Sequence, residues 1–248
     1  MKQLFPTMYS RPKKGMLFAI VVYWFIGFVM VPMWMPFMAW GIWDNHKAVA
    51  WLEIGYHVMN CIAMAMMLKD CMEDGWFMMT TDKKSSLKHI GLTIGLILGA
   101  LAVQIALLFA WGVDPGYSLQ MLPVAEKGVA LTSGYLVSLR PILGTASMVL
   151  CVPIAVCGLY YSLGFAPLCV KNKPVLAYLN VVLLTAIPAV IDILWRQQVK
   201  IIVIEYLVQL PAHLIACWSY QKTDNVWTPI LSLAGVNLIC ALANIFLR

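Results

Sequence analysis

A polar stripe interrupts the apolar segment that precedes the turn at residues 221–225. Glu205, Gln209 and His213 recur at four-residue spacing, so in a helix they share one face, with Pro211 loosening the backbone between them. A carboxylate and an imidazole on one face could activate water or carry a proton. Ionisable groups in an apolar segment are costly and face protein or a water-filled cavity. Glu205 and His213 are therefore candidate catalytic residues, with Gln209 lining their cavity.

Other polar residues also fall inside apolar segments. Glu53 and His57 are four residues apart and form a second polar pair, either a rim anchor or a proton or cation ligand. Asp192 can pair with the basic residue four positions later, or it can line the cavity. Arg140 can act as a counter-ion to these carboxylates at the cavity wall. Asn237 can complete that wall or bond across helices.

The composition excludes a soluble domain. Hydrophobic residues make up 62% of the 248 positions and charged residues 11%, whereas a soluble domain carries about a quarter charged residues. The net charge of +6 comes from short basic stretches beside apolar segments, which indicates membrane topology rather than a nucleic-acid partner. Seven cysteines without a CxxC or HExxH motif predict neither a metal site nor a cofactor.

We predict an all-α, polytopic transmembrane helix bundle with about seven spans, within a range of six to eight. Each span needs about twenty apolar residues. The basic residues of the short loops favour a cytoplasmic amino terminus, with residues 1–14 and 69–88 on that side. The chain forms one integral membrane domain, 1–248. The expected spans are 15–40, 48–68, 89–112, 134–157, 174–195, 199–220 and 227–247.

Two regions are harder to assign. Residues 135–169 are apolar but contain several prolines and glycines, which favours one kinked helix followed by a re-entrant or interfacial turn, with two short spans as the alternative. The loop 69–88 carries Trp76 and Phe77 among charged residues, and we expect it to be an amphipathic segment on the membrane surface or a solvated connector. Residues 114–132 are expected to pack over the opposite mouth of the bundle.

The turn after the polar stripe carries a family resemblance. Residues 220–231, YQKTDNVWTPIL, resemble the helix-ending "Y-x-x-T-G-x-x-W-x-P-I-L" turn of the CAAX-protease and bacteriocin-processing (CPBP, or Abi) intramembrane proteins. Asn237 falls where the last family motif ends in asparagine. The resemblance implies a CPBP-like core over residues 134–247 and a location in a bacterial plasma membrane.

Active members of that family use paired glutamates, two histidines and an asparagine. Aligned from the Trp227 turn, this chain places Val156 and Cys157 at the paired glutamates, Tyr161 at the associated arginine and Leu233 at the final histidine. Only Asn237 matches. The resemblance therefore implies a degenerate protease that binds a membrane protein or peptide in a regulatory, scaffold or peptide-immunity role.

Two other functions remain open from the residues. An active intramembrane protease would use Glu205 and His213 as a rearranged acid–base pair. A small proton-coupled transporter would use the ionisable groups of the spans, although no inverted repeat is present. The sequence does not predict the oligomeric state or the identity of the partner.

Overall fold

The computed structural model describes residues 46–112, 144–196 and 199–246, and these residues form helices without strands. The first expected span, 15–40, and the connection 114–132 lie outside the described residues. Helices occupy the described positions of the other six expected spans, of which 134–157 is described only from residue 144. In order, the elements are α3 (His46–Met67), α4 (Lys69–Thr81), α5 (Lys83–Ala110), the helical run Gly144–Val170, α10 (Pro174–Arg196), α11 (Val199–Thr223) and α12 (Trp227–Phe246).

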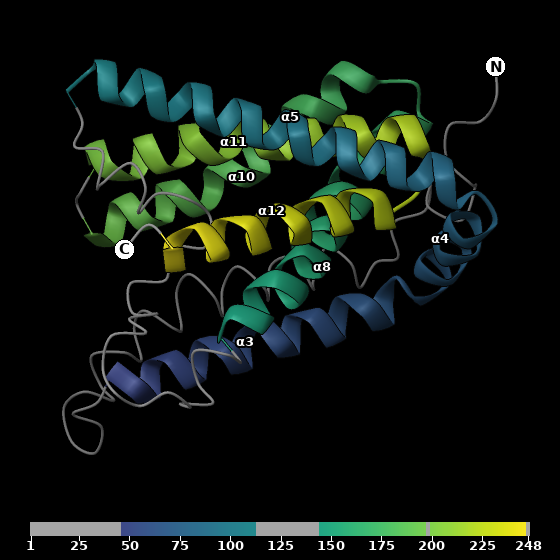
Figure 1. The fold of residues 1–248 in the computed structure, drawn as a ribbon, viewed down its shortest axis with the longest axis horizontal. Coiled ribbons are helices and arrows are strands. Elements are labelled where there is room, and N and C mark those ends of the chain that lie inside the picture. Colours follow the sequence, from purple (N-terminus) through teal and green to yellow (C-terminus); the bar gives the residue numbers. More distant parts are fainter. Residues whose placement is uncertain (1–45, 113–143, 197–198, 247–248) are drawn as a thin grey trace.

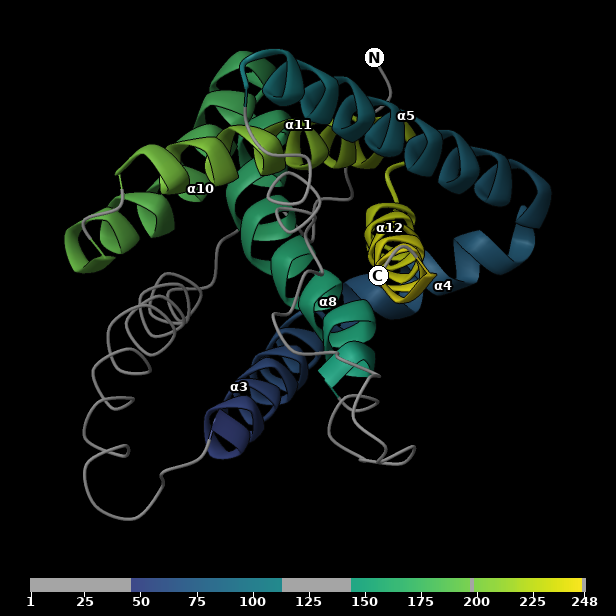
Figure 2. The same ribbon diagram turned by 60° about the vertical axis from the view of Figure 1, so that its left-hand side comes forward.

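The helices pack in two groups. Helix α5 packs against α11 and α12, and α11 also packs against α10 (Figure 1). Helix α3 packs against the first part of the run Gly144–Val170 and lies below the first group in the rotated view (Figure 2), whereas residues 157–170 of the run rise to pack against α10. One hydrophobic cluster joins α3, α4, the run Gly144–Val170, α10, α11 and α12, and a second lies among α5, α11 and α12.

Two of the described helices are long and apolar enough to cross a membrane. They are Lys83–Ala110 and Gly144–Val170. Shorter apolar stretches occur at His57–Met67, Pro174–Ile187 and Trp227–Ala243. The all-helical class is confirmed, whereas the number of seven spans is not.

The prediction of a loop at 69–88 is wrong in its secondary structure, because helices cover nearly all of these residues, while its position on the cytoplasmic side stays a prediction. Helix α4 occupies most of the segment, and α5 begins at Lys83, six residues before the expected start of the span. The Asp82 carboxylate explains this early start, since it accepts a hydrogen bond of 3.2 Å from the Ser85 backbone N–H and so caps α5. Trp76 and Phe77 on α4 are exposed, which fits both a membrane-surface segment and a solvated connector.

The predicted re-entrant turn is also wrong, because the chain stays helical from Gly144 to Val170. Two π-helical segments interrupt the α-helical geometry, η3 (Ser147–Cys151) and η4 (Cys157–Phe165). They precede two short α-helical pieces, α8 (Val152–Val156) and α9 (Ala166–Val170), which carry Pro153 and Pro167 near their starts. In a π-helix carbonyls bond five residues ahead, so each wide turn accommodates the following proline without ending the helix.

Candidate functional site

His213 contacts two consecutive tyrosines of η4. Its Nδ1 lies 3.0 Å from the Tyr161 hydroxyl, a hydrogen bond in which tyrosine donates when Nδ1 is unprotonated. The Tyr160 ring stands edge-on to the imidazole, with ring centroids 5.6 Å apart. Neighbouring side chains diverge less in a π-helix than in an α-helix, which explains how two adjacent tyrosines reach one histidine. Such π-helical turns are frequent at functional sites.

The surroundings of this pair are apolar. Tyr161 is fully buried in the first hydrophobic cluster, together with Cys157 and Cys217. The Oγ of Ser162, the next residue of η4, is buried and has no hydrogen-bond partner among the described residues. Within the described residues no group of three or more His, Cys, Asp or Glu side chains could hold a metal ion. The site is thus a neutral tyrosine–histidine contact inside a hydrophobic core.

The structure describes two side chains of the predicted stripe on α11, and they lie in different surroundings. His213 is half-buried against η4, whereas the Gln209 side chain, one turn earlier, is exposed. The Glu205 side chain lies outside the described residues, although its backbone belongs to α11. Helix α11 continues through Pro211. Of the two described stripe side chains, His213 lies in the buried site and Gln209 does not.

Asn237 forms a hydrogen bond across helices, one of the two roles that the sequence allowed for it. Its Nδ2 donates a hydrogen bond of 2.9 Å to the backbone carbonyl of Met148 in η3. The bond ties α12 to that π-helical segment within the second hydrophobic cluster, away from the cluster that surrounds His213. Leu233, which stands at the family's final histidine, packs against both clusters. Asn237 and His213 therefore belong to different packing environments.

The remaining predicted residues are mostly outside the described side chains. This holds for Arg140 and for the side chains of Glu53 and Asp192. His57 is half-buried on α3. The pairing of Glu53 with His57 therefore stays a prediction.

The turn that carries the family resemblance holds α4 in place. The Asn225 Nδ2 donates a hydrogen bond of 2.9 Å to the Gly75 carbonyl, and its Oδ1 accepts one of 2.9 Å from the Trp227 backbone N–H. The Trp227 indole Nε1 donates to the Met72 carbonyl at 2.7 Å, and its ring stands edge-on to Trp76, with centroids 5.4 Å apart. We call Asn225, Trp227, Met72, Gly75 and Trp76 the turn clamp.

The backbone of α4 approaches the Asn225 and Trp227 side chains so closely that only glycine fits at position 75. A Cβ at this position would lie 2.8 Å from the Asn225 Oδ1 and 3.2 Å from the Trp227 Cδ1. Asp224, one residue before Asn225, has a φ of 53°, in the left-handed region that favours glycine, and glycine is the residue in the corresponding family turn. Burial raises the pKa of the Asp224 carboxyl to about 7.

The prediction from sequence missed a stripe of small residues on α5. Gly91, Gly95 and Gly99 recur every four residues, all three are exposed, and a Cβ at any of them would meet no atom of the described residues within 4 Å. The signal was present in the sequence as GLTIGLILG. Small residues at this spacing allow the backbones of two transmembrane helices to approach closely. We call these three residues the glycine stripe.

No family model, no curated protein and no solved structure matches this chain. The geometry of the described residues therefore carries the functional argument.

Proposed function

We propose that this chain is a multi-pass membrane protein that binds a transmembrane helix of a membrane protein or peptide partner and does not cleave it. The observation that carries the proposal is the glycine stripe, an open row of small residues on the outer face of α5. A partner helix can lie along this row at short backbone distance, where van der Waals packing and interhelical contacts stabilise association.

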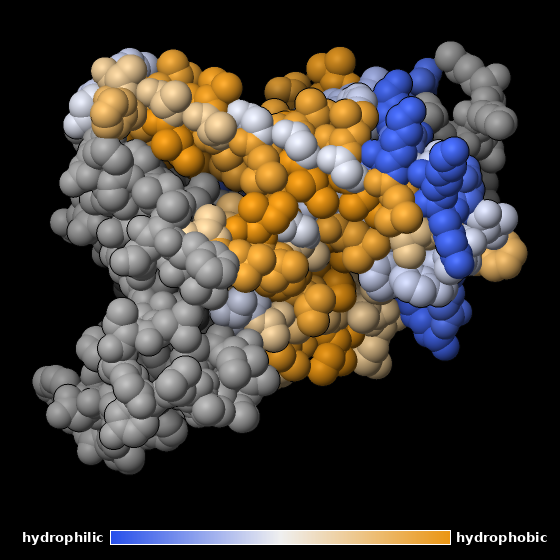
Figure 3. Space-filling view, in the orientation of Figure 1, coloured by the Kyte–Doolittle hydropathy of each residue, from blue (hydrophilic) through white to orange (hydrophobic). Residues whose placement is uncertain are grey.

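The surface of α5 supports a membrane location. Its 28 residues span about 42 Å, more than the roughly 30 Å of hydrocarbon in a bilayer. Large apolar side chains are exposed along it, including Leu92, Leu96, Val103 and Phe109. Figure 3 shows apolar residues over the sides of the helices and hydrophilic residues gathered at the end formed by α4 and the start of α5. Such a distribution fits helices in lipid with one polar end in water, and the positive charges there favour the cytoplasm.

The residues at the family's catalytic positions support a non-proteolytic role. Cys157, Tyr161 and Leu233 stand where the resemblance implies a glutamate, the arginine and a histidine, and all three pack in hydrophobic clusters. Water activation requires a general base within hydrogen-bond reach of a water molecule. The hydrogen bond to Tyr161 occupies Nδ1 of His213, and buried apolar side chains surround the pair.

A matched pair of glycine substitutions tests the proposal. Gly95→Ile fills the centre of the glycine stripe, while Gly55→Ile adds the same side chain on α3, at another exposed glycine with no atom within 4 Å of a Cβ. The tagged full chain is purified from native membranes in mild detergent, each copurifying protein is identified, and its binding to the purified chain is then measured. A second copy of this chain counts as a partner.

The proposal expects Gly95→Ile to weaken partner binding by tenfold or more and Gly55→Ile to leave it unchanged. Equal binding by both variants and the natural chain would refute the glycine stripe as the docking face. Cleavage is measured on the same material by mass spectrometry of candidate peptides. Products that disappear in Glu205→Gln would replace this proposal with the rearranged protease.

A further inference from the structure

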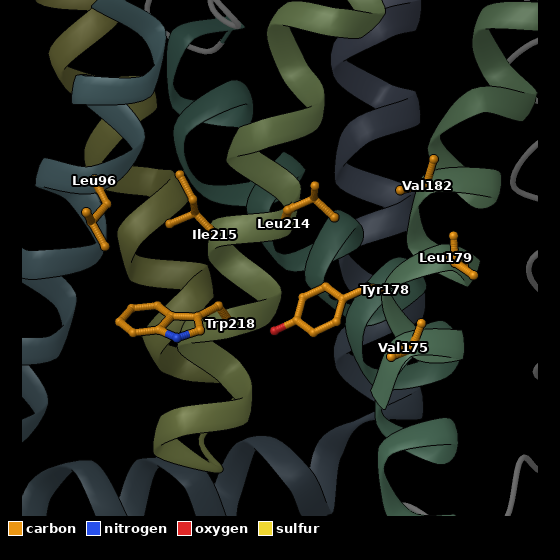
Figure 4. A pocket seen from close by; sticks show the side chains of 8 residues that line it. All are labelled: Leu96, Val175, Tyr178, Leu179, Val182, Leu214, Ile215 and Trp218. Carbon is orange, nitrogen blue, oxygen red and sulfur yellow. The ribbon is translucent and has the colours of Figure 1, made fainter. Parts of the chain in front are cut away.

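An apolar groove lies on the outer side of the bundle, between α5 and α10 and over α11. Its volume is about 580 Å³, within the range of small-molecule sites. Figure 4 shows side chains from all three helices around it, with the Tyr178 and Trp218 rings at one level. The lining residues are Leu96, Val175, Tyr178, Leu179, Val182, Leu214, Ile215 and Trp218.

The two aromatic rings give the groove a direction. Tyr178 belongs to the second turn of α10, and its hydroxyl donates a hydrogen bond of 2.9 Å to the Gln221 Oε1, near the end of α11. Trp218 lies one turn before that end. Tyrosine and tryptophan place their polar atoms toward headgroups and their rings toward hydrocarbon. The groove therefore runs from an aromatic end near the helix termini toward the apolar middle of the helices.

Exposed lysines continue the groove beyond its aromatic end. Lys222 lies one turn after Trp218 on the same face of α11. Lys171 and Lys173 immediately precede α10, whose first turn supplies Val175. The nearest carboxyl in sequence, Asp224, is half-buried beside Lys222. Among the described residues, none of the three lysines forms a salt bridge.

We propose that the groove binds an acyl chain of an anionic phospholipid from the surrounding bilayer, with its phosphate held by Lys222 and Lys173. The apolar lining suits a hydrocarbon chain, and the lysines supply the complementary charge at the end where a headgroup would lie. Basic pockets between transmembrane helices recognise anionic headgroups in this way. The inference rests on the membrane location in the proposed function but is independent of the glycine stripe.

The site is tested by native mass spectrometry of the purified full chain with phosphatidylglycerol and with phosphatidylcholine of identical acyl chains. The double variant Lys173→Gln/Lys222→Gln removes the headgroup contacts. Its matched control, Lys83→Gln/Lys84→Gln, removes the same charge at the start of α5. Leu179→Trp fills the groove, and Val175→Trp is the second filling variant if the first does not fold. Glycerol 3-phosphate serves as a headgroup without a chain.

The natural chain is expected to retain phosphatidylglycerol over phosphatidylcholine, with on the order of fivefold weaker binding for each lysine removed. Filling the groove should abolish this preference, and the α5 control and Gly95→Ile should bind like the natural chain. Equal loss in the α5 control would show nonspecific attraction, and unchanged binding in both filling variants would show that no acyl chain occupies the groove. Displacement of the lipid by glycerol 3-phosphate at the concentrations at which the lipid itself binds would indicate a phosphate site alone. Each of these results overturns the proposal.

Discussion

Removing the Asn225 side chain should detach α4 from the turn before α12. Asn225 is only 4% exposed and makes two hydrogen bonds, each of 2.9 Å. In Asn225→Ala, the Trp227 backbone N–H loses its acceptor at the start of α12, a loss similar to that of a helix cap, about 1 kcal/mol. The Gly75 carbonyl loses a buried donor, which costs about 1–2 kcal/mol. The free energy of unfolding should therefore fall by about 2.5 kcal/mol.

Asn225→Asp separates the two hydrogen bonds. A carboxylate can still accept from the Trp227 N–H, but it places a second oxygen where Nδ2 donated to the Gly75 carbonyl. This variant should keep the start of α12 and lose the contact with α4. Lys222→Ala is the control, because Lys222 is exposed at the same end and its substitution should change stability by less than about 0.5 kcal/mol.

Thermal unfolding of the full chain in detergent, followed by tryptophan fluorescence, measures both variants. For a chain of this size, 2.5 kcal/mol corresponds to a decrease in Tm of roughly 5–10 °C. Limited proteolysis reports separately on α4, since release from the turn clamp should expose its backbone near Trp76. A Tm for Asn225→Ala within 1 °C of the natural chain, with α4 still protected, would refute the role assigned to the turn clamp.

Two further predictions concern single polar groups. Tyr161→Phe should lower the free energy of unfolding by about 1–3 kcal/mol, because it leaves the His213 Nδ1 without its hydrogen-bond partner. The double variant Tyr161→Phe/His213→Leu should lose less stability than the sum of the two single losses, as measured by unfolding. Asp224 has a folded pKa of about 7, above the ordinary value, so its contribution to stability is fully present below about pH 4 and is lost as the pH rises through 7. Asp224→Asn should therefore match the natural chain at pH 4 and exceed its Tm at pH 8; a pH-independent difference would contradict this assignment.

The helices could be predicted from the sequence because their signal is local. A run of apolar residues long enough to cross a bilayer is visible without any knowledge of packing, so the described parts of six expected spans are helical, although only two of these helices are long and apolar enough to cross a membrane. The errors arose where local rules compete. The charged residues at 83–88 suggested a loop, but the Asp82 cap starts α5 before them. Pro167 suggested the end of a helix, but the π-helical turns of η4 accommodate this proline within the helix.

The site depended on contacts between distant residues. His213 was identified because an ionisable side chain in an apolar segment costs free energy. Its partner Tyr161 lies 52 residues earlier, and nothing in either segment specifies that pairing. The contact between Asn225 and Gly75 spans 150 residues. The glycine stripe differs from both, because its spacing is local and its exposure could have been predicted from the buried face of α5, which carries Ile90, Ile97 and Leu101.

Gly235 and Gly95 differ in whether a larger side chain would disturb packing within the protein or only its outer surface. Gly235 lies on α12, and a Cβ there would lie 2.7 Å from the Ile94 Cδ1 of α5. Its substitution would therefore disturb the contact between α5 and α12 within the protein. Gly95, one residue after Ile94, is exposed, and a Cβ there would meet no atom of the described residues within 4 Å. Helix α5 thus uses one face to pack against the described bundle and leaves the face with Gly95 free of it, which is why enlargement of Gly95, unlike enlargement of Gly235, can report on a partner.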